Sequence, residues 1–254
     1  APRAERGQVL IVTSQSGASG EIVRYLDEHA ASDRIIGMTL DPDSPLAKCG
    51  RVLIGAGGVE TAYAATRSLV VTLAMHAVLL EKLGADIAGF ENALRADDAI
   101  DTGAAADMLA GCRNAVIVGR GPMQGVADAA ALSFMELARI PVLGLEAGQF
   151  RHGPFEMVDR DSAVVFLRGS GFEGDNIDGI AAECVDAGLH PLVFDFSGEG
   201  DIDGCLTMRL PERVGLAAAV SALMAVQKAI VAASARMVAD VGVPLRSKKV
   251  TSRR

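Results

Sequence analysis

The sequence predicts an α/β protein in which helices cover both faces of parallel β-sheets. Half of its 254 residues are hydrophobic, only 4% are aromatic and none is Trp, so the core is built from aliphatic side chains. Aliphatic runs are typical of parallel strands, which are buried on both faces. Short β-branched runs alternate with segments of helical periodicity, and this alternation favours parallel sheets with helices packed on their faces.

The first predicted elements are a strand, a Ser-rich turn and a helix. The run 9–12 (Val-Leu-Ile-Val) predicts a buried strand, and residues 18–29 carry apolar side chains near the 3.6-residue spacing of a helix. A second strand-like run opens at Ile35. Residues 61–84 then predict a long helix.

The sequence matches its own pattern when it is shifted by 154 residues. The turn Ser16-Gly17 then falls on Ser170-Gly171, and the helix 61–84 falls on residues 215–238. Each copy reads as strand, loop, helix, strand, short strand and long helix. A repeat of this length predicts duplicated domains rather than a solenoid.

The second copy opens with a unit that the first copy lacks. Residues 115–118 predict a strand, the turn Gly119-Arg120-Gly121 follows, and a helix over 124–139 leads to a strand over 140–145. The first copy's counterpart would precede residue 1. Because a sheet without its central strand would leave backbone groups unpaired, we expect that the natural chain extends upstream or that the layer comes from elsewhere.

These elements divide the chain into two predicted domains. The first spans residues 1–90 and is incomplete at its N-terminus. Residues 91–112 form a linker with a helix, because Asp-rich turns there are typical of a helix start. The second domain spans residues 113–254 and includes the C-terminal tail.

Charge and composition exclude several classes of function. The chain has 24 basic and 32 acidic residues, and its one cationic cluster is the tail from residue 246 to 254, so we expect no binding to nucleic acid. No uninterrupted apolar stretch reaches about 18 residues and no signal peptide is evident, which predicts a cytoplasmic protein without a membrane span. The four cysteines form no C-x-x-C pair and the histidines lack ligand spacing, so we expect neither a metal nor another cofactor.

The strongest local signal for chemistry is the Ser-rich loop, residues 14–19. It follows a predicted strand and opens a predicted helix, where free N–H groups and the helix dipole favour an anion. The hydroxyl groups of Ser14, Ser16 and Ser19 and the amide of Gln15 add donors for a phosphate. The segment lacks the Gly-Lys-Ser/Thr of a Walker loop. The alternative is an ordinary helix start capped by Ser14 or Ser16.

Two further residues suggest acid–base chemistry. His152 lies between Arg151 and Gly153-Pro154, a loop position where an imidazole can transfer protons near neutral pH, and the alternative is a structural loop histidine. Glu136 lies near the end of the helix 124–139 among apolar neighbours. Such surroundings raise a carboxyl pKa, as a base for C–H proton transfer requires, and the alternative is a surface acid.

Together these motifs resemble the sugar isomerase (SIS) domain family, and in particular the isomerase half of glucosamine-6-phosphate synthase, ketosamine-phosphate deglycases and amino-sugar-phosphate deaminases. The family's Ser-Gln-Ser-Gly-x-Ser/Thr appears at residues 14–19, its Gly-Arg-Gly at 119–121, and its Lys-His-Gly-Pro as residues 151–154. Its Ala-Ser-Thr-Lys appears as residues 64–67, preceded by Glu60. The resemblance covers nearly the whole chain and implies two αβα sandwich domains of the flavodoxin-like or Rossmann-like type, internally duplicated, the first lacking its opening strand and helix.

The resemblance implies a phosphosugar isomerase, deaminase or deglycase acting on a hexose or amino-sugar 6-phosphate. Glu136 would move a proton between C1 and C2, and His152, donated by the other subunit of a homodimer, would assist ring opening. Lys248 matches the spacing of the synthase lysine that forms a Schiff base with the open-chain ketose, and Lys249 fits other relatives. The positions implied to hold phosphate and substrate are Ser14, Gln15, Ser16, Ser19, Glu60, Ala64 and Ala65.

Three departures from the synthase pattern leave alternatives open. Ser133 stands where the synthase has a lysine, and Ala65 replaces a serine that contacts the sugar. No glutaminase domain precedes the repeat, so we expect that the chain cannot draw ammonia from glutamine. The alternatives to an enzyme are a non-catalytic phosphosugar-binding regulator and an inactive fragment.

Overall fold

The computed structural model describes residues 8–29, 34–96, 100–171, 176–246 and 249. Two compact units make up the chain: residues 1–85 together with 244–254, and residues 86–243. The domain boundaries predicted from the sequence stay a prediction, because compactness does not show which segment folds independently.

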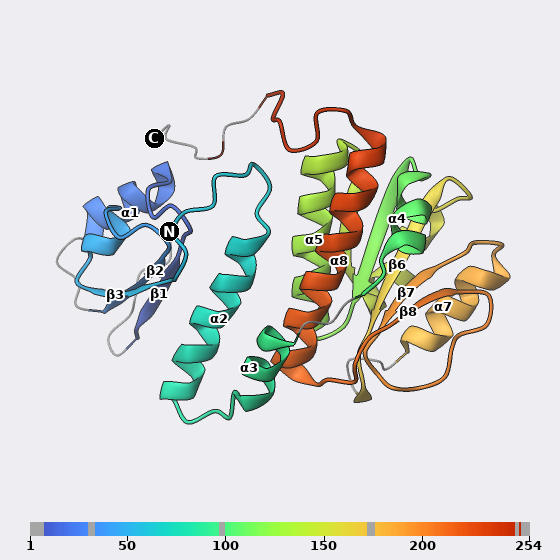
Figure 1. Cartoon of the computed structure of the whole chain (residues 1–254), viewed down its shortest axis with the longest axis horizontal. Helices are drawn as coiled ribbons and strands as arrows, with labels where there is room; N and C mark the ends of the chain where they lie inside the picture. Colours follow the sequence, from blue (N-terminus) through green and yellow to red (C-terminus); the bar gives the residue numbers. More distant parts are fainter. Residues whose placement is uncertain (1–7, 30–33, 97–99, 172–175, 247–248, 250–254) are drawn as a thin grey trace. The chain divides into compact units, whose positions relative to one another are not determined.

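The first unit is built on a parallel sheet of order β1-β2-β3 (Figure 1). Its elements are β1 (Leu10–Thr13), α1 (Gly20–His29), β2 (Ile35–Thr39), the 3-10 helix η1 (Leu46–Lys48), β3 (Arg51–Ile54) and α2 (Arg67–Lys82). Ile35 packs with Leu26 of α1, whereas Met38 packs with Met75 of α2. Because side chains three positions apart on a strand point to opposite faces, α1 and α2 cover opposite faces of the sheet.

The second unit contains a five-stranded parallel sheet of order β5-β4-β6-β7-β8. Its strands are β4 (Asn114–Gly119), β5 (Val142–Glu146), β6 (Ser162–Arg168), β7 (Leu192–Asp195) and β8 (Leu206–Arg209). Its helices are α3 (Ala88–Arg95), α4 (Gly103–Ala110), α5 (Pro122–Ala138), α6 (Ala147–Arg151), the 3-10 helix η2 (Pro154–Met157), α7 (Ile177–Asp186) and α8 (Gly215–Met237).

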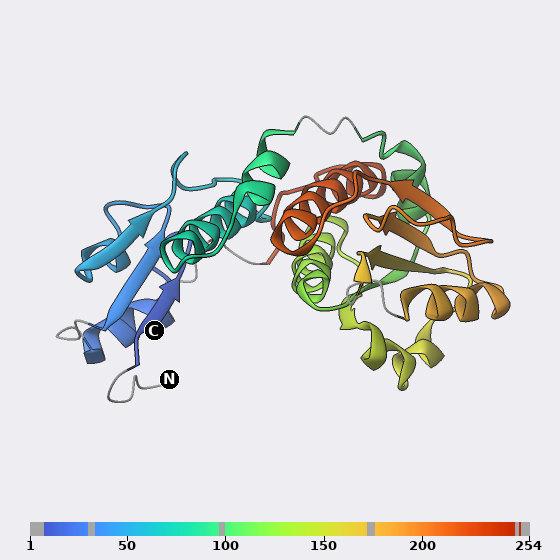
Figure 2. The ribbon, with the colours of Figure 1, turned by 90° about the horizontal axis from the view of Figure 1, so that it is seen from below.

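Helices cover both faces of the second sheet, as Figures 1 and 2 show for α8 and α7. On one face α8 packs against α3, α4 and α5. On the other face Phe150 of α6 and Ile180 of α7 join Val116 of β4 and Phe166 of β6 in one buried cluster. The central strands β4 and β6 are buried almost throughout, as aliphatic parallel strands should be.

The parallel α/β architecture predicted from the sequence is confirmed. The strand order β1-β2-β3 repeats as β6-β7-β8, and β4 with β5 forms the additional unit that was expected only in the second half. The internal duplication itself stays a prediction. Between residues 91 and 112 the sequence predicted a linker with one helix. In the structure α3 overlaps the start of that segment and α4 lies within it.

Helix α8 is the one described helix that is long and apolar enough to cross a membrane, with a mean hydropathy of 1.8. In the structure 72% of the apolar window of α8 is buried, and the helix packs against α4 and α5. Its apolar composition is therefore accounted for by a position in the core of the second unit.

Candidate functional site

The Ser-rich loop lies at the carboxyl end of β1 and leads directly into α1. Gly17 adopts φ +57°, and a Cβ there would lie 2.3 Å from the Ser44 hydroxyl oxygen, so a side chain is excluded. The backbone N–H of Gly17 donates to Ser14 Oγ at 3.2 Å, and that of Ala18 donates to Ser16 Oγ at 3.4 Å. The turn is therefore shaped by a tightly packed glycine and by its own hydroxyl groups.

The carboxyl end of strand β2 is hydrogen-bonded to the Ser-rich loop. The carbonyl oxygen of Gln15 accepts hydrogen bonds from Thr39 Oγ1 at 3.1 Å and from the backbone N–H of Leu40 at 3.0 Å. The predicted phosphate-binding residues Ser14, Gln15, Ser16 and Ser19 are all partly exposed. They line a fixed backbone turn at the strand end, which is where open α/β sheets bind ligands.

A second loop, residues 60–66, joins the Ser-rich loop through Gln15. The side-chain amide of Gln15 donates to the backbone carbonyl of Glu60 at 3.2 Å. Ala64 is buried and Ala65 is partly exposed in this same loop. The structure thus brings together the two segments that the family resemblance implied would hold substrate.

The Glu60 carboxylate caps the N-terminus of α2. It accepts hydrogen bonds from the backbone N–H groups of Thr66, Arg67 and Ser68 at 3.1 Å each, from Thr66 Oγ1 at 2.7 Å, and from Ser68 Oγ. Burial raises the pKa of this carboxyl, but the hydrogen bonds from Ser68 and Thr66 outweigh it and lower the pKa to about 2. Glu60 is therefore a structural anion, and α2 begins at residue 67 rather than at 61 as predicted.

The C-terminal tail reaches the same loop. Lys249 Nζ donates to the backbone carbonyl of Tyr63 at 3.0 Å. Lys248, the tail lysine with the synthase spacing, lies outside the described residues. The sequence gave no sign of the Tyr63 contact, because a carbonyl acceptor can belong to any residue type.

Glu136 and His152 belong to the second unit. Glu136 is partly exposed in the last turn of α5, between the exposed Met135 and the buried Leu137. Ser133, one turn earlier, is buried and its hydroxyl donates to the carbonyl of Ala129 at 3.0 Å. The serine that replaces the expected lysine is therefore turned to its own helix backbone.

His152 follows α6, and a capping box fixes that short helix. Glu146 accepts from the backbone N–H groups of Gly148 at 2.6 Å and Gln149 at 3.3 Å, while Gln149 Oε1 accepts from the N–H of Glu146. His152 itself is exposed, and Gly153 beside it has φ +136°, a conformation that favours glycine. Sequence reasoning missed this box, because the usual signature has Ser, Thr, Asp or Asn at the N-cap, whereas Glu146 stands there with Gln149 three residues later.

Comparison with known proteins identifies the second unit. The sequence profile of the family described as SIS domain matches residues 108–232. The chain contains a SIS domain. The matched segment runs from α4 to α8 and includes all five strands of the second sheet together with Glu136 and His152.

The SIS-domain chain also resembles longer proteins. It is 30% identical over 188 residues to the isomerizing glutamine–fructose-6-phosphate aminotransferase of Thermotoga maritima, a match that covers 64% of this chain and 30% of that protein. The chain thus spans under a third of the length of that curated relative.

Solved structures share the fold at low sequence identity. The C-terminal domain of glucosamine-fructose-6-phosphate aminotransferase from Francisella tularensis superposes with a TM-score of 0.79 at 18% identity, covering 94% of this chain and 76% of that chain. Tagatose-6-phosphate ketose/aldose isomerase from Escherichia coli gives 0.74 at 18% identity, covering 90% and 68% respectively. The neighbours of this SIS protein thus include a phosphosugar isomerase.

Proposed function

We propose that this SIS protein is an enzyme that acts on a hexose or amino-sugar 6-phosphate by acid–base proton transfer between C1 and C2. The observation that carries the proposal is the Ser-rich loop, whose partly exposed hydroxyls surround a fixed turn before α1 and whose Gln15 bonds to the 60–66 loop. A phosphate held there would be a fixed handle for the rest of the sugar.

Each predicted site residue has a distinct role in this proposal. Ser14, Gln15, Ser16 and Ser19 bind the phosphate, and Ala64 and Ala65 line the sugar. Glu60 acts one step away from the substrate, because both of its carboxylate oxygens already accept hydrogen bonds from the start of α2. The role of Glu60 is to position the loop that carries Ala64 and Ala65.

The proton chemistry is assigned to the second unit and the tail. His152 assists ring opening, and its exposure fits donation across the interface of a homodimer. Glu136 shuttles the proton between C1 and C2, and such a group typically contributes about 10²–10⁴-fold to the rate. Lys248 supplies the amine for the open-chain ketose, and the enzyme works in the cytoplasm.

The reaction at C1 and C2 could be isomerisation, deamination or deglycation. Ser133 stands where the synthase has a lysine, and its hydroxyl is bonded within α5. We therefore propose that the proton relay relies on Glu136 without an adjacent amine. A non-catalytic phosphosugar-binding regulator is the alternative, and it would need the Ser-rich loop alone.

The test combines ligand-induced thermal stabilisation with turnover on a panel of ketose and amino-sugar 6-phosphates. The parent chain, Glu136→Gln and Ser16→Ala are compared, and Glu91→Gln, an exposed acid on α3, is the matched control. We expect Glu136→Gln to bind but not turn over, Ser16→Ala to bind weakly, and Glu91→Gln to match the parent. Equal binding by the parent and Glu136→Gln without turnover by either would favour the regulator, and binding unaffected by Ser16→Ala would remove the loop from the site.

A further inference from the structure

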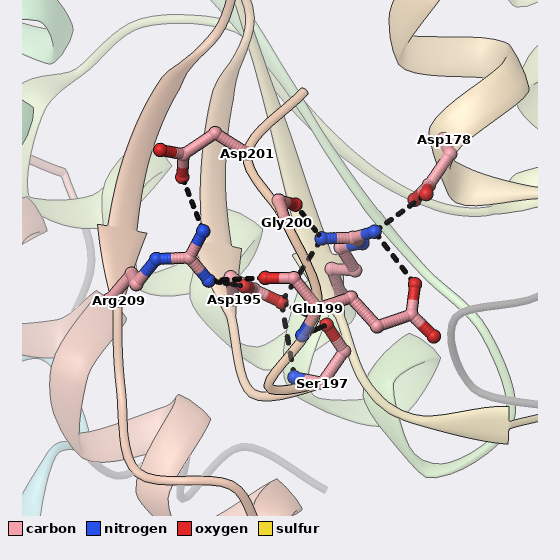
Figure 3. Close-up of polar contacts among 8 residues, drawn as sticks. Asp178, Asp195, Ser197, Glu199, Gly200, Asp201 and Arg209 are labelled. Atoms are coloured by element: carbon pink, nitrogen blue, oxygen red, sulfur yellow. Dashed lines mark hydrogen bonds and ion pairs between the residues drawn. The ribbon is translucent and has the colours of Figure 1, made fainter. Parts of the chain in front are cut away.

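Two arginines lie on either side of Asp195 at the carboxyl ends of β6, β7 and β8 in the second unit (Figure 3). Arg168 pairs in register with Asp195, and Asp195 pairs with Arg209. Asp195 Oδ2 accepts from Arg209 Nη1 at 2.8 Å, and Asp195 Oδ1 lies 3.6 Å from Arg168 Nη1. These three residues, called here the arginine row, place two guanidinium groups on either side of one buried carboxylate.

The arginine row lies at the strand ends that correspond to Ser14, Thr39 and Ile54 in the first unit. In the first sheet Thr39 ends the middle strand and pairs with Ile54, and Ser14 directly follows Thr13, whose partner is Met38. Counting along strands of the same order and direction, Ser14, Thr39 and Ile54 correspond to the three members of the row. Carboxyl ends of parallel strands are ligand positions in open α/β sheets, so the strand ends of both sheets are candidates for a ligand.

Carboxylates of the same chain already cover the arginine row. Arg168 Nη2 donates to Asp178 Oδ2 at 2.6 Å and to Glu199 Oε2 at 3.0 Å, and Arg209 Nη2 donates to Asp201 Oδ1 at 2.7 Å. Backbone carbonyls complete the cover, since Arg168 Nη1 donates to Gly200 and Arg209 Nη1 donates to Glu199. The loop between β7 and β8 therefore presents oxygen atoms to both guanidinium groups, as a bound oxyanion would.

Burial separates the permanent part of this cluster from the replaceable part. The side chains of Arg168 and Asp195 are 3% and 1% exposed and that of Arg209 is 46% exposed, whereas those of Asp178, Glu199 and Asp201 are 52%, 64% and 66% exposed. Because these three carboxylates are half-exposed or more, solvent and solutes reach them, whereas the buried guanidinium of Arg168 needs an acceptor in their place. A buried, preorganised guanidinium, in contrast, is well suited to phosphate and sulfate oxygens.

We propose that Arg168 and Arg209 form a latent binding site for a phosphate or sulfate group, which the chain's own Asp178, Glu199 and Asp201 occupy as tethered competitors. Two guanidinium groups face four carboxylates when Asp195 is included, so the cluster is net negative and repels a free anion. Removal of the three exposed charges leaves two guanidinium groups against Asp195 alone, which makes the cluster net positive. This inference concerns the second unit and does not rest on the proposed function.

The test titrates inorganic phosphate into the full chain and follows the backbone amides of Gly198 and Gly200 by NMR, separately from those of residues 15–19. The parent is compared with the triple variant Asp178→Asn/Glu199→Gln/Asp201→Asn. We expect saturable phosphate binding at Gly200 in the triple variant, at least about tenfold tighter than in the parent. Adding Arg209→Gln to the triple variant should abolish that gain.

Circular dichroism and urea unfolding check that each variant is folded, and the double variant Glu199→Gln/Asp201→Asn serves if the triple variant is not. A folded variant that binds phosphate at Gly200 no better than the parent would mean that the arginines only hold the loop. Saturable phosphate binding at Gly200 in the parent, at the strength of the variant, would overturn the role of the carboxylates as competitors. A gain that survives Arg209→Gln would overturn the assignment to the arginine row.

Discussion

The side-chain amide of Gln15 donates a hydrogen bond to the backbone carbonyl of Glu60, 45 residues away in the chain. This bond connects the Ser-rich loop at the end of β1 with the loop that leads into α2. The Glu60 carboxylate is hydrogen-bonded to the first residues of α2. The helix, the 60–66 loop and the Ser-rich loop are therefore joined by one network of hydrogen bonds. A change at Glu60 should therefore alter the conformation of the Ser-rich loop.

Replacing Glu60 by Gln should destabilise the protein in a pH-dependent way. The folded-state pKa of about 2 lies below the ordinary carboxyl value of 4.5, so the carboxylate contributes stability above the unfolded pKa and loses it as the pH falls toward 2. We expect Glu60→Gln to lower the free energy of unfolding by about 2–3 kcal/mol at pH 7 and by much less near pH 3. Urea unfolding at several pH values measures this difference.

The control for Glu60 is Glu28→Gln, because Glu28 is an exposed acid in a surface ion pair with Arg24. It should change the free energy of unfolding by less than about 1 kcal/mol at any pH. A Glu60→Gln effect that stays constant between pH 7 and pH 3 would contradict the assigned role of the ionised carboxylate.

Replacing Gly17 by Ala should disrupt the Ser-rich loop. The new Cβ would meet Ser44 and Thr39 side chains at 2.3–2.9 Å, and φ +57° is unfavourable for alanine. We expect a destabilisation of about 1–3 kcal/mol together with a loss of sugar-phosphate binding, measured by thermal unfolding with and without ligand. Gly179→Ala is the matched control, because a Cβ there meets open space on α7, and it should stabilise the chain slightly.

Replacing Asp195 by Asn should destabilise the second unit more than any change at its exposed partners. Asp195 is buried between two guanidinium groups and also accepts from the N–H and hydroxyl of Ser197. Removing one partner of a buried ion pair typically costs about 3–5 kcal/mol. Asp201→Asn should cost less than about 1 kcal/mol, so similar denaturation midpoints for the two variants would refute this ranking.

The two tail lysines should separate binding from turnover. Lys249 is bonded to the Tyr63 carbonyl, so Lys249→Ala should weaken binding of the sugar phosphate by loosening the tail from the 60–66 loop. Lys248→Ala should remove turnover while leaving binding intact. Steady-state kinetics should show mainly a raised KM for Lys249→Ala and a lowered kcat for Lys248→Ala, and the reverse pattern would exchange the two roles.

Much of the fold could be predicted because its signals are local. The aliphatic runs of β4 and β6 identify buried parallel strands, and the Ser-Gly turn at residues 16–17 places a helix start directly after β1. The start of α2 could not be predicted in the same way. Apolar periodicity continues back to residue 61, whereas the helix begins at 67. At that point the carboxylate of Glu60 accepts hydrogen bonds from backbone N–H groups that have no partner within the helix.

The sequence by itself determined the parallel α/β architecture and the Ser-rich loop, since periodicity and turn chemistry act over a few neighbouring residues. Only the tertiary structure decided which polar groups are already satisfied. In the folded chain Glu60 is hydrogen-bonded to the start of α2, and Lys249 is hydrogen-bonded to a carbonyl 186 residues away. Arg168 pairs with carboxylates from three other segments. Such pairings depend on which strand ends meet in space, and burial then makes an unsatisfied charge too costly to leave unpaired.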